Sequence, residues 1–91
     1  MAILATMCVN IRAASYDVYI GRGSKWGNPF RIGRDGTRED VIIKYRKYIR
    51  SQPHLIAALH ELKGRRLGCY CSPLACHGDI LVKLVKKHCF S

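Results

Sequence analysis

The 91-residue sequence lacks long apolar stretches, since its longest uncharged runs, residues 1–11 and 67–78, fall short of the ~18 residues that span a bilayer. It begins without the basic segment and cleavage pattern typical of an export signal. In that context, an odd count of five cysteines argues against a disulfide scaffold. We therefore expect a cytoplasmic protein without a membrane segment, in which cysteines serve as metal ligands, reactive thiols or core residues.

Acidic residues are scarce, because six Asp and Glu stand against sixteen Lys and Arg, for a formal net charge of +10. A field of this sign attracts polyanions and speeds association with nucleic acid or nucleotides. The basic residues cluster in segments 44–50, 63–66 and 86–87. Phosphate-backbone binding requires such clusters on one side of the fold, which the sequence does not fix. The charge predicts an anionic partner, with nucleic acid as the leading candidate.

The length fits a single domain over residues 1–91, because a separate core needs roughly 100 residues. Residues 7–12, 16–22 and 66–71 have the composition of strands. Helices are predicted from a near capping box at Thr37 and Asp40, from Ser51 to Gly64, and over residues 76–88. The fold class is therefore α/β, a small single-domain sandwich of order β-β-α-α-β-α. Its short sheet is at least partly parallel, since two helices separate the second and third strands.

Three cysteines and a histidine gather in the stretch C-Y-C-S-P-L-A-C-H-G-D, residues 69–79. On the predicted elements, Cys71 ends a strand, residues 72–75 form a turn and residues 76–79 open the last helix. Ligands bind beyond the carboxyl ends of strands in α/β sheets, and a helix N-terminus favours an anion. This stretch is therefore the strongest candidate for a functional site.

Zinc is one interpretation of this stretch, because Cys69, Cys71, Cys76 and His77 supply a Cys₃His set. Structural zinc sites usually use C-x₂₋₄-C turns, however, whereas the first two cysteines here are two residues apart on a predicted strand. An iron–sulfur cluster normally needs four cysteines, and this compact set has three.

A thiolate site is another interpretation. The helix N-terminus would lower the pKa of Cys76 or of a facing Cys71, and His77 would act as proton acceptor or cation partner. Asp79 would orient the imidazole or cap the helix. A purely structural role for the motif also fits the pattern. Outside the motif, Cys8 and Cys89 are expected to fill the core and to lie in a frayed tail, respectively.

A glycine-rich loop, G-R-G-S-K-W-G-N-P-F at residues 21–30, follows the second predicted strand. Its cations can reach an anion and its glycines permit close backbone approach. The tryptophan either stacks on a base or, with Phe30, holds the loop on the core, and the asparagine can form an Asx turn. A Walker phosphate loop is absent. The predicted ligand-binding residues are Arg22, Gly23, Ser24, Lys25, Trp26 and Asn28.

Together, the loop and the stretch L-G-C-Y-C-S-P-L-A-C-H-G-D-I-L resemble the domain of unknown function 4326 family of bacteria and phages, over Val9 to about Leu84. The C-terminal piece also resembles a second uncharacterised family, whose motif ends in C-x-E-x₄-C-H-R. In that comparison Cys71 holds the Glu position and Gly78 the Arg position. If that arginine binds an anion, the resemblance implies that Arg22 or Lys25 replaces it.

The leading functional hypothesis is a phosphate-bearing ligand, nucleotide or nucleic acid, bound between the Arg22 loop and the turn at residues 71–79, with thiolate chemistry by Cys71 or Cys76. A second hypothesis is a non-enzymatic, zinc-stabilised nucleic-acid-binding module. A third is a phage or mobile-element accessory protein that binds a host protein.

Overall fold

The computed structural model describes residues 6–71 and 74–89. In chain order, its elements are β1 (Met7–Asn10), β2 (Val18–Tyr19), α1 (Arg38–Arg50), α2 (Pro53–Ala57), the 3₁₀ helix η1 (Leu59–Leu62), β3 (Arg66–Cys69) and α3 (His77–Cys89). The α/β class and the order β-β-α-α-β-α expected from the sequence are confirmed.

The three strands form one parallel sheet in the order β1-β3-β2. Asn10 pairs with Cys69 at the end of β1, and Tyr19 pairs with Gly68 at the end of β2. The carboxyl ends of all three strands therefore meet at one edge, where α/β sheets bind ligands. The central position of β3 brings residues near the N-terminus beside the cysteine–histidine stretch.

All three strands are shorter than predicted, and side-chain hydrogen bonds lie at the end of β1 and the start of β2. Asn10 Oδ1 accepts a hydrogen bond from the Arg12 amide at 2.9 Å, which ends β1 before residues 11–12. At the start of β2, Asp17 Oδ2 accepts from the Arg66 amide at 2.8 Å. The third strand also stops early, at Cys69, so Cys71 lies beyond the sheet.

The predicted capping box opens α1. Thr37 Oγ1 accepts from the Asp40 amide at 3.2 Å, and Asp40 Oδ2 accepts from the Thr37 amide at 2.9 Å. Val41, Tyr45 and Ile49 form the buried stripe of this helix. Because the cap fixes where the helix begins, it also fixes the position of Arg38, its first residue.

The segment predicted as one helix from Ser51 to Gly64 divides into α2 and η1. The division still buries the expected apolar residues, with Leu55, Leu59 and Leu62 at 2% exposure or less. Gly64 has a φ of +71°, which turns the chain toward β3 at a position where other residues would be strained.

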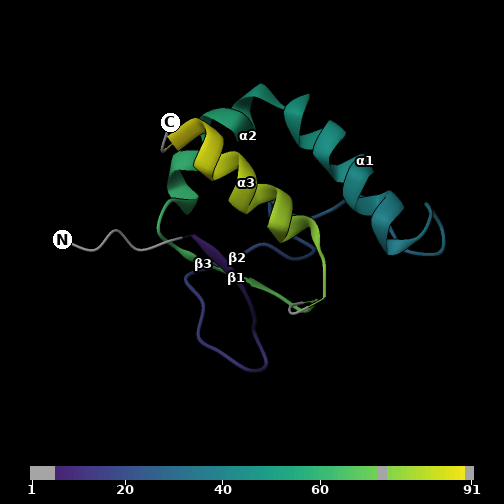
Figure 1. The fold of residues 1–91 in the computed structure, drawn as a ribbon, viewed down its shortest axis with the longest axis horizontal. Coiled ribbons are helices and arrows are strands. Elements are labelled where there is room, and N and C mark those ends of the chain that lie inside the picture. Colours follow the sequence, from purple (N-terminus) through teal and green to yellow (C-terminus); the bar gives the residue numbers. More distant parts are fainter. Residues whose placement is uncertain (1–5, 72–73, 90–91) are drawn as a thin grey trace.

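All helices lie on one side of the strands, as Figure 1 shows, and α3 packs against α1, η1 and β1. Residues 11–17 extend on the other side of the sheet. There, a Cβ at Gly68 would lie 2.6 Å from atoms of both Ile11 and Tyr16, so glycine is needed for this close packing. None of the described helices is long and apolar enough to cross a membrane.

Candidate functional site

A cavity of about 240 Å³ lies at the carboxyl edge of the sheet. The glycine-rich loop, the start of α1, the segment after β3 and the start of α3 all contribute to its wall. The lining residues are Tyr19, Gly21, Arg22, Asn28, Phe30, Ile32, Arg38, Val41, Ile42, Cys69, Tyr70, Cys71, Ala75, Cys76 and His77. The two segments singled out in the sequence thus meet around one space.

The wall of this cavity combines apolar side chains with two cations. Ile32 and Tyr70 remain more than half exposed, which leaves apolar surface beside the opening to solvent. Arg22 is exposed, and Arg38 is half-buried with its Nη1 donating to the Ala75 carbonyl oxygen at 3.1 Å. Arg12 lies over the Tyr70 ring, 5.2 Å from its centroid. The cavity is suited to a ligand with an apolar ring and an anionic group.

Asn28 shapes the loop through both ends of its amide. Its Nδ2 donates to the Val41 carbonyl oxygen at 3.2 Å, and its Oδ1 accepts from the Phe30 amide at 2.9 Å. The second bond is the Asx turn considered in the sequence. Asn28 lines the cavity, but these contacts fasten the loop to α1 and place Phe30 in the wall.

The other residues predicted to bind ligand from this loop have different contacts. Trp26 is 2% exposed in the core, and its carbonyl oxygen accepts a 2.7 Å hydrogen bond from Tyr45 Oη, whose pKa is raised by burial. Ser24 Oγ donates to the Gly21 carbonyl oxygen at 2.7 Å. Lys25 Nζ lies 2.7 Å from Glu61 Oε1, an exposed ion pair. These side chains and Gly23, which has a φ of +91°, are outside the described cavity lining.

His77 lines the cavity as the first residue of α3. Its Nε2 lies 2.6 Å from the Ile20 carbonyl oxygen and therefore donates, which leaves Nδ1 as the acceptor nitrogen of the neutral ring. The ring meets Tyr45 edge-on, with centroids 5.0 Å apart. Asp79, predicted either to orient this imidazole or to cap the helix, accepts from the Cys76 amide at 3.0 Å through Oδ2. The observed contact of Asp79 is therefore a helix cap.

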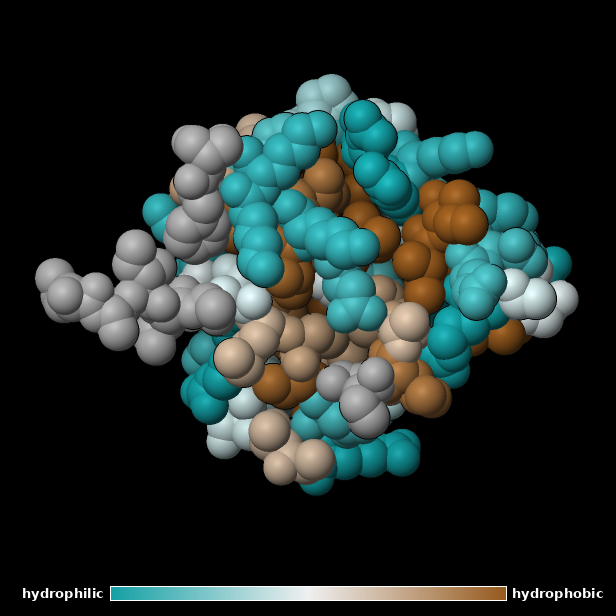
Figure 2. Space-filling view, viewed as in Figure 1, coloured by the Kyte–Doolittle hydropathy of each residue, from teal (hydrophilic) through white to brown (hydrophobic). Residues whose placement is uncertain are grey.

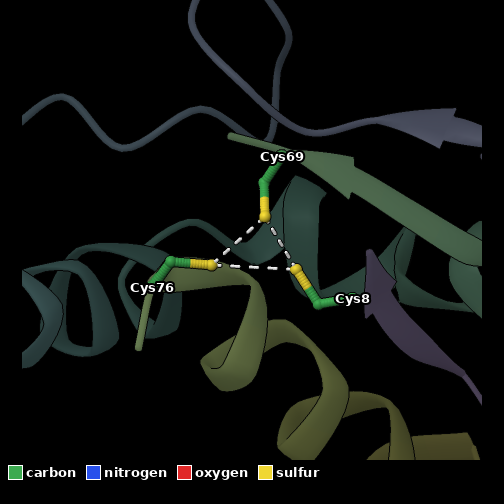
Figure 3. Close-up of side chains that lie close together, drawn as sticks. All are labelled: Cys8, Cys69 and Cys76. Atoms are coloured by element: carbon green, nitrogen blue, oxygen red, sulfur yellow. Dashed lines mark hydrogen bonds between the residues drawn. The ribbon is translucent and has the colours of Figure 1, made fainter. Parts of the chain in front are cut away.

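Beneath the cavity, the sulfurs of Cys8, Cys69 and Cys76 form a triangle (Figure 3). The Cys8–Cys69 separation is 3.0 Å, Cys8–Cys76 is 3.7 Å and Cys69–Cys76 is 3.6 Å. The first two cysteines come from β1 and β3, and Cys76 precedes α3. We refer to these three residues as the sulfur triangle.

Cys76 is also the N-cap of α3. Its Sγ accepts from the Gly78 amide at 3.3 Å, while Asp79 accepts from the amide of Cys76 itself. The hydrogen bond from Cys8, followed by that from Gly78, lowers the pKa of Cys76 to about 6 against the opposing effect of burial. Conversely, the interaction with Cys76 and burial raise the pKa of Cys8. Of Cys8 and Cys76, Cys76 is thus the one that carries negative charge more readily.

The triangle differs from the Cys₃His set considered in the sequence. Cys69 and Cys76 belong to it, whereas Cys71 and His77 lie in the cavity wall and Cys8 supplies the third sulfur. No sequence motif includes Cys8, because Cys8 comes close to Cys69 and Cys76 only when β1 pairs with β3. Cys89 is not a frayed tail either, since it is the last residue of α3 and packs on the core.

Glycine at position 78 makes room for the triangle. A Cβ there would lie 2.6 Å from Cys8 Sγ and 2.9 Å from Ile20 Cδ1, closer than real Cβ contacts allow. This gives a packing reason for Gly78 where the second resembling family has arginine. The cations near the site come instead from Arg22, one of the two expected replacements, and from Arg38, which the sequence did not indicate.

A second feature lies farther along α3, where it faces α1. Arg46 and Arg50 of α1 and Lys83 and Lys87 of α3 surround a groove of about 170 Å³ with Ile80 and Leu84 in its lining. Figure 2 shows hydrophilic side chains gathered over these helices with apolar side chains between them. Basic residues from two separate segments therefore converge on one surface, which we call the basic groove.

Comparisons with known proteins place the chain among viral relatives. It is 42% identical to an uncharacterised 12.4 kDa protein from the nrdA–td intergenic region of Enterobacteria phage T4, over 87% of this chain and 76% of that one. It is 40% identical to the uncharacterised protein R718 of Acanthamoeba polyphaga mimivirus, over 77% of this chain and 67% of that one. No solved structure matches it.

A family model covers nearly all of the described chain. The model for Domain of unknown function (DUF4326) matches residues 7–87, which include the sulfur triangle, the cavity lining and the basic groove. This match confirms the resemblance drawn from the loop and the cysteine–histidine stretch. The chain belongs to the DUF4326 family.

Proposed function

We propose that the cavity binds a nucleoside phosphate, with the base among the apolar side chains and the phosphate at Arg22 and Arg38. The observation that carries the proposal is the meeting of apolar walls and two arginines around one space. Guanidinium groups bind phosphate oxygens through paired, charge-assisted hydrogen bonds. Inside the cavity, Tyr19, Phe30 and Tyr70 offer aromatic surface of the kind on which bases stack.

The size of the cavity favours one ring system rather than a large ligand. At about 240 Å³ it is somewhat smaller than the ~300–1000 Å³ of sites for drug-sized molecules. A base fits such a volume while its sugar and phosphate remain toward solvent. Arg22 is exposed and suits that outer position. His77 also lines the cavity, and with Nε2 donating to Ile20 its Nδ1 is the nitrogen that would accept a hydrogen bond from the ligand.

The bound nucleoside phosphate would be either a free nucleotide or one nucleotide within a single-stranded nucleic acid. The net charge of +10 attracts both. The basic groove favours the strand, since its four cations offer contacts to further phosphates. Binding is the proposed function, and the Cys71 thiol in the cavity wall is the group through which thiolate chemistry would act on a bound ligand.

Calorimetric titration of the purified protein tests the proposal. Nucleoside monophosphates are compared with the matching nucleosides, inorganic phosphate and short single-stranded oligonucleotides. We expect the monophosphate to bind more tightly than the nucleoside or phosphate alone. Arg22→Ala should weaken it by about 10–100-fold, the equivalent of a charge-assisted hydrogen bond of ~1.5–3 kcal/mol.

Arg46→Ala is the matched control, because it removes an arginine from the basic groove and leaves the cavity intact. Equal losses with Arg22→Ala and Arg46→Ala would show that net charge alone governs binding and would reject the cavity. If oligonucleotides bind and monophosphates do not, a strand is the source. Failure of all nucleotide ligands to bind would reject the proposed function.

A further inference from the structure

We propose that the sulfur triangle of Cys8, Cys69 and Cys76 binds one zinc ion. The three sulfurs converge from β1, from the end of β3 and from the N-cap of α3, which are far apart in the sequence. Cys69 and Cys76 are 1% and 4% exposed, and Cys8 is half-buried. The site is independent of the proposed nucleotide function, since a metal could stabilise the fold whether or not the cavity has a ligand.

The distances within the triangle are close to those of zinc–thiolate sites. Zinc–sulfur bonds of about 2.3 Å in a tetrahedron place neighbouring sulfurs about 3.8 Å apart. The separations from Cys76 to the other two sulfurs, 3.7 and 3.6 Å, already match this spacing. Only the Cys8–Cys69 separation of 3.0 Å must widen, by less than an ångström. A change of less than an ångström in one separation therefore brings the three sulfurs to the spacing of a zinc site.

The donor set also selects the kind of ion. Thiolates are soft ligands that suit zinc or copper(I) and exclude calcium and magnesium, which require oxygen ligands. Cys76 adds a helix N-terminus and the Gly78 amide, both of which favour the thiolate that a metal requires. Gly78 leaves the space at the start of α3 that the sulfur of Cys8 occupies, since a Cβ at position 78 would lie 2.6 Å from that sulfur.

The fourth zinc ligand would come from the cavity side. Cys69 and Cys76 line the cavity as well as belonging to the triangle. A site with three protein ligands and a cavity at its fourth position leaves room for a water molecule, as in zinc centres that are open to ligands. We therefore place a water molecule from the cavity in the fourth position.

Metal analysis of the complete chain, purified without a histidine tag in a non-chelating reductant, tests the proposal. We expect about one zinc per chain, and substitution with cobalt(II) should give thiolate-to-metal charge-transfer absorption. Cys8→Ser should reduce zinc affinity by more than roughly 100-fold, because loss of even an outer-shell partner costs about 10–100-fold. Circular dichroism of the variant establishes that it is folded.

Cys71→Ser is the matched control, since Cys71 lies in the cavity wall outside the triangle. It should retain about one zinc. The proposal is overturned if the native protein takes up no stoichiometric zinc, if copper(I) is bound instead, or if Cys71→Ser loses zinc while Cys8→Ser keeps it. Should Cys8→Ser fail to fold, the cobalt spectrum of the native protein decides, because absence of thiolate charge transfer rejects the site.

Discussion

The two ends of α3 show two different ways of presenting a polar surface. At its start, Cys76 and His77 are fixed by bonds to Gly78, Asp79 and Ile20. Farther along the same helix, the cations of the basic groove are exposed and surround an apolar floor. The start of α3 therefore holds hydrogen-bond donors and acceptors at fixed positions, whereas the basic groove supplies positive charge on exposed side chains. We therefore expect ligand selectivity at the start of α3 and salt-dependent attraction beyond it.

The largest effect is expected from Gly78→Val, which breaks the start of α3 and leaves the basic groove unchanged. The added carbons must displace Cys8 and Ile20, so the free energy of unfolding should fall by about 1–3 kcal/mol, as in overpacked cores. Urea denaturation measures this loss. Lys86→Val, an exposed position on the same helix, is the control for the helix propensity of valine. Equal losses in the two variants would contradict the packing argument.

Neutralising the basic groove tests the contribution of the other part of α3. Replacement of Arg46, Arg50, Lys83 and Lys87 by glutamine should lower the slope of log affinity against log salt for a single-stranded oligonucleotide. Each phosphate contact contributes about 0.7 to this slope, so the decrease should approach ~3. Affinity for a nucleoside monophosphate should hardly change. An unchanged oligonucleotide slope would exclude the groove as the backbone contact.

A smaller effect is expected from Tyr45→Phe, which loosens the cavity loop. The variant removes the hydroxyl that donates to the buried Trp26 carbonyl oxygen, and should cost about 1 kcal/mol of unfolding free energy. Tryptophan fluorescence during urea denaturation measures it. Tyr48→Phe, at the neighbouring half-buried ring, is the control. A loss at Tyr48 as large as that at Tyr45 would show that the hydrogen bond has no particular role.

The smallest effect concerns the cap that positions Arg38. Hydrogen bonds from Thr37, chiefly from its amide, lower the pKa of Asp40 below its ordinary value of 3.8. A lowered carboxyl pKa stabilises the fold above that ordinary value, and the contribution is lost as pH falls through the folded pKa. The difference in urea midpoint between the native protein and Asp40→Asn should therefore shrink between pH 7 and pH 2.

Glu39→Gln, one position earlier in the same helical turn, is the control for removing a carboxylate. If its difference from the native protein changes with pH as much as that of Asp40→Asn, the capping box is not the cause of the pH dependence.

The sequence predicted most of the elements because they are encoded locally. Thr37 and Asp40 are three residues apart, and the stripe of Val41, Tyr45 and Ile49 repeats at helical spacing, so each can be recognised without tertiary information. Strand ends were less accurate, because they depend on specific side-chain hydrogen bonds, from the Arg12 amide to Asn10 and from the Arg66 amide to Asp17. The residues of the site depend more strongly on packing.

Cys8 could not be identified as a partner of Cys69 and Cys76 without knowing that β1 lies beside β3. Strand order is decided by how helices and strands pack together, not by any one segment. Arg38 was missed for a related reason. The capping box around it predicts only where α1 begins, whereas its place in the cavity wall depends on α1 lying beside the segment that contains Ala75. Conversely, Trp26 and Ser24 were predicted to bind ligand because of the composition of the glycine-rich loop. Their observed contacts are with the protein core and the loop backbone, respectively.

Nuclear magnetic resonance titration of the ¹⁵N-labelled protein with a nucleoside monophosphate, and separately with a short single-stranded oligonucleotide, follows the backbone amides at both ends of α3 in one experiment. With the monophosphate we expect saturable shifts of the backbone amides of Arg22, Cys71 and His77 around the cavity, with little change at Lys83 and Lys87. Shifts confined to the basic groove, or no saturable shifts around the cavity with either the monophosphate or the oligonucleotide, would contradict nucleotide binding in the cavity.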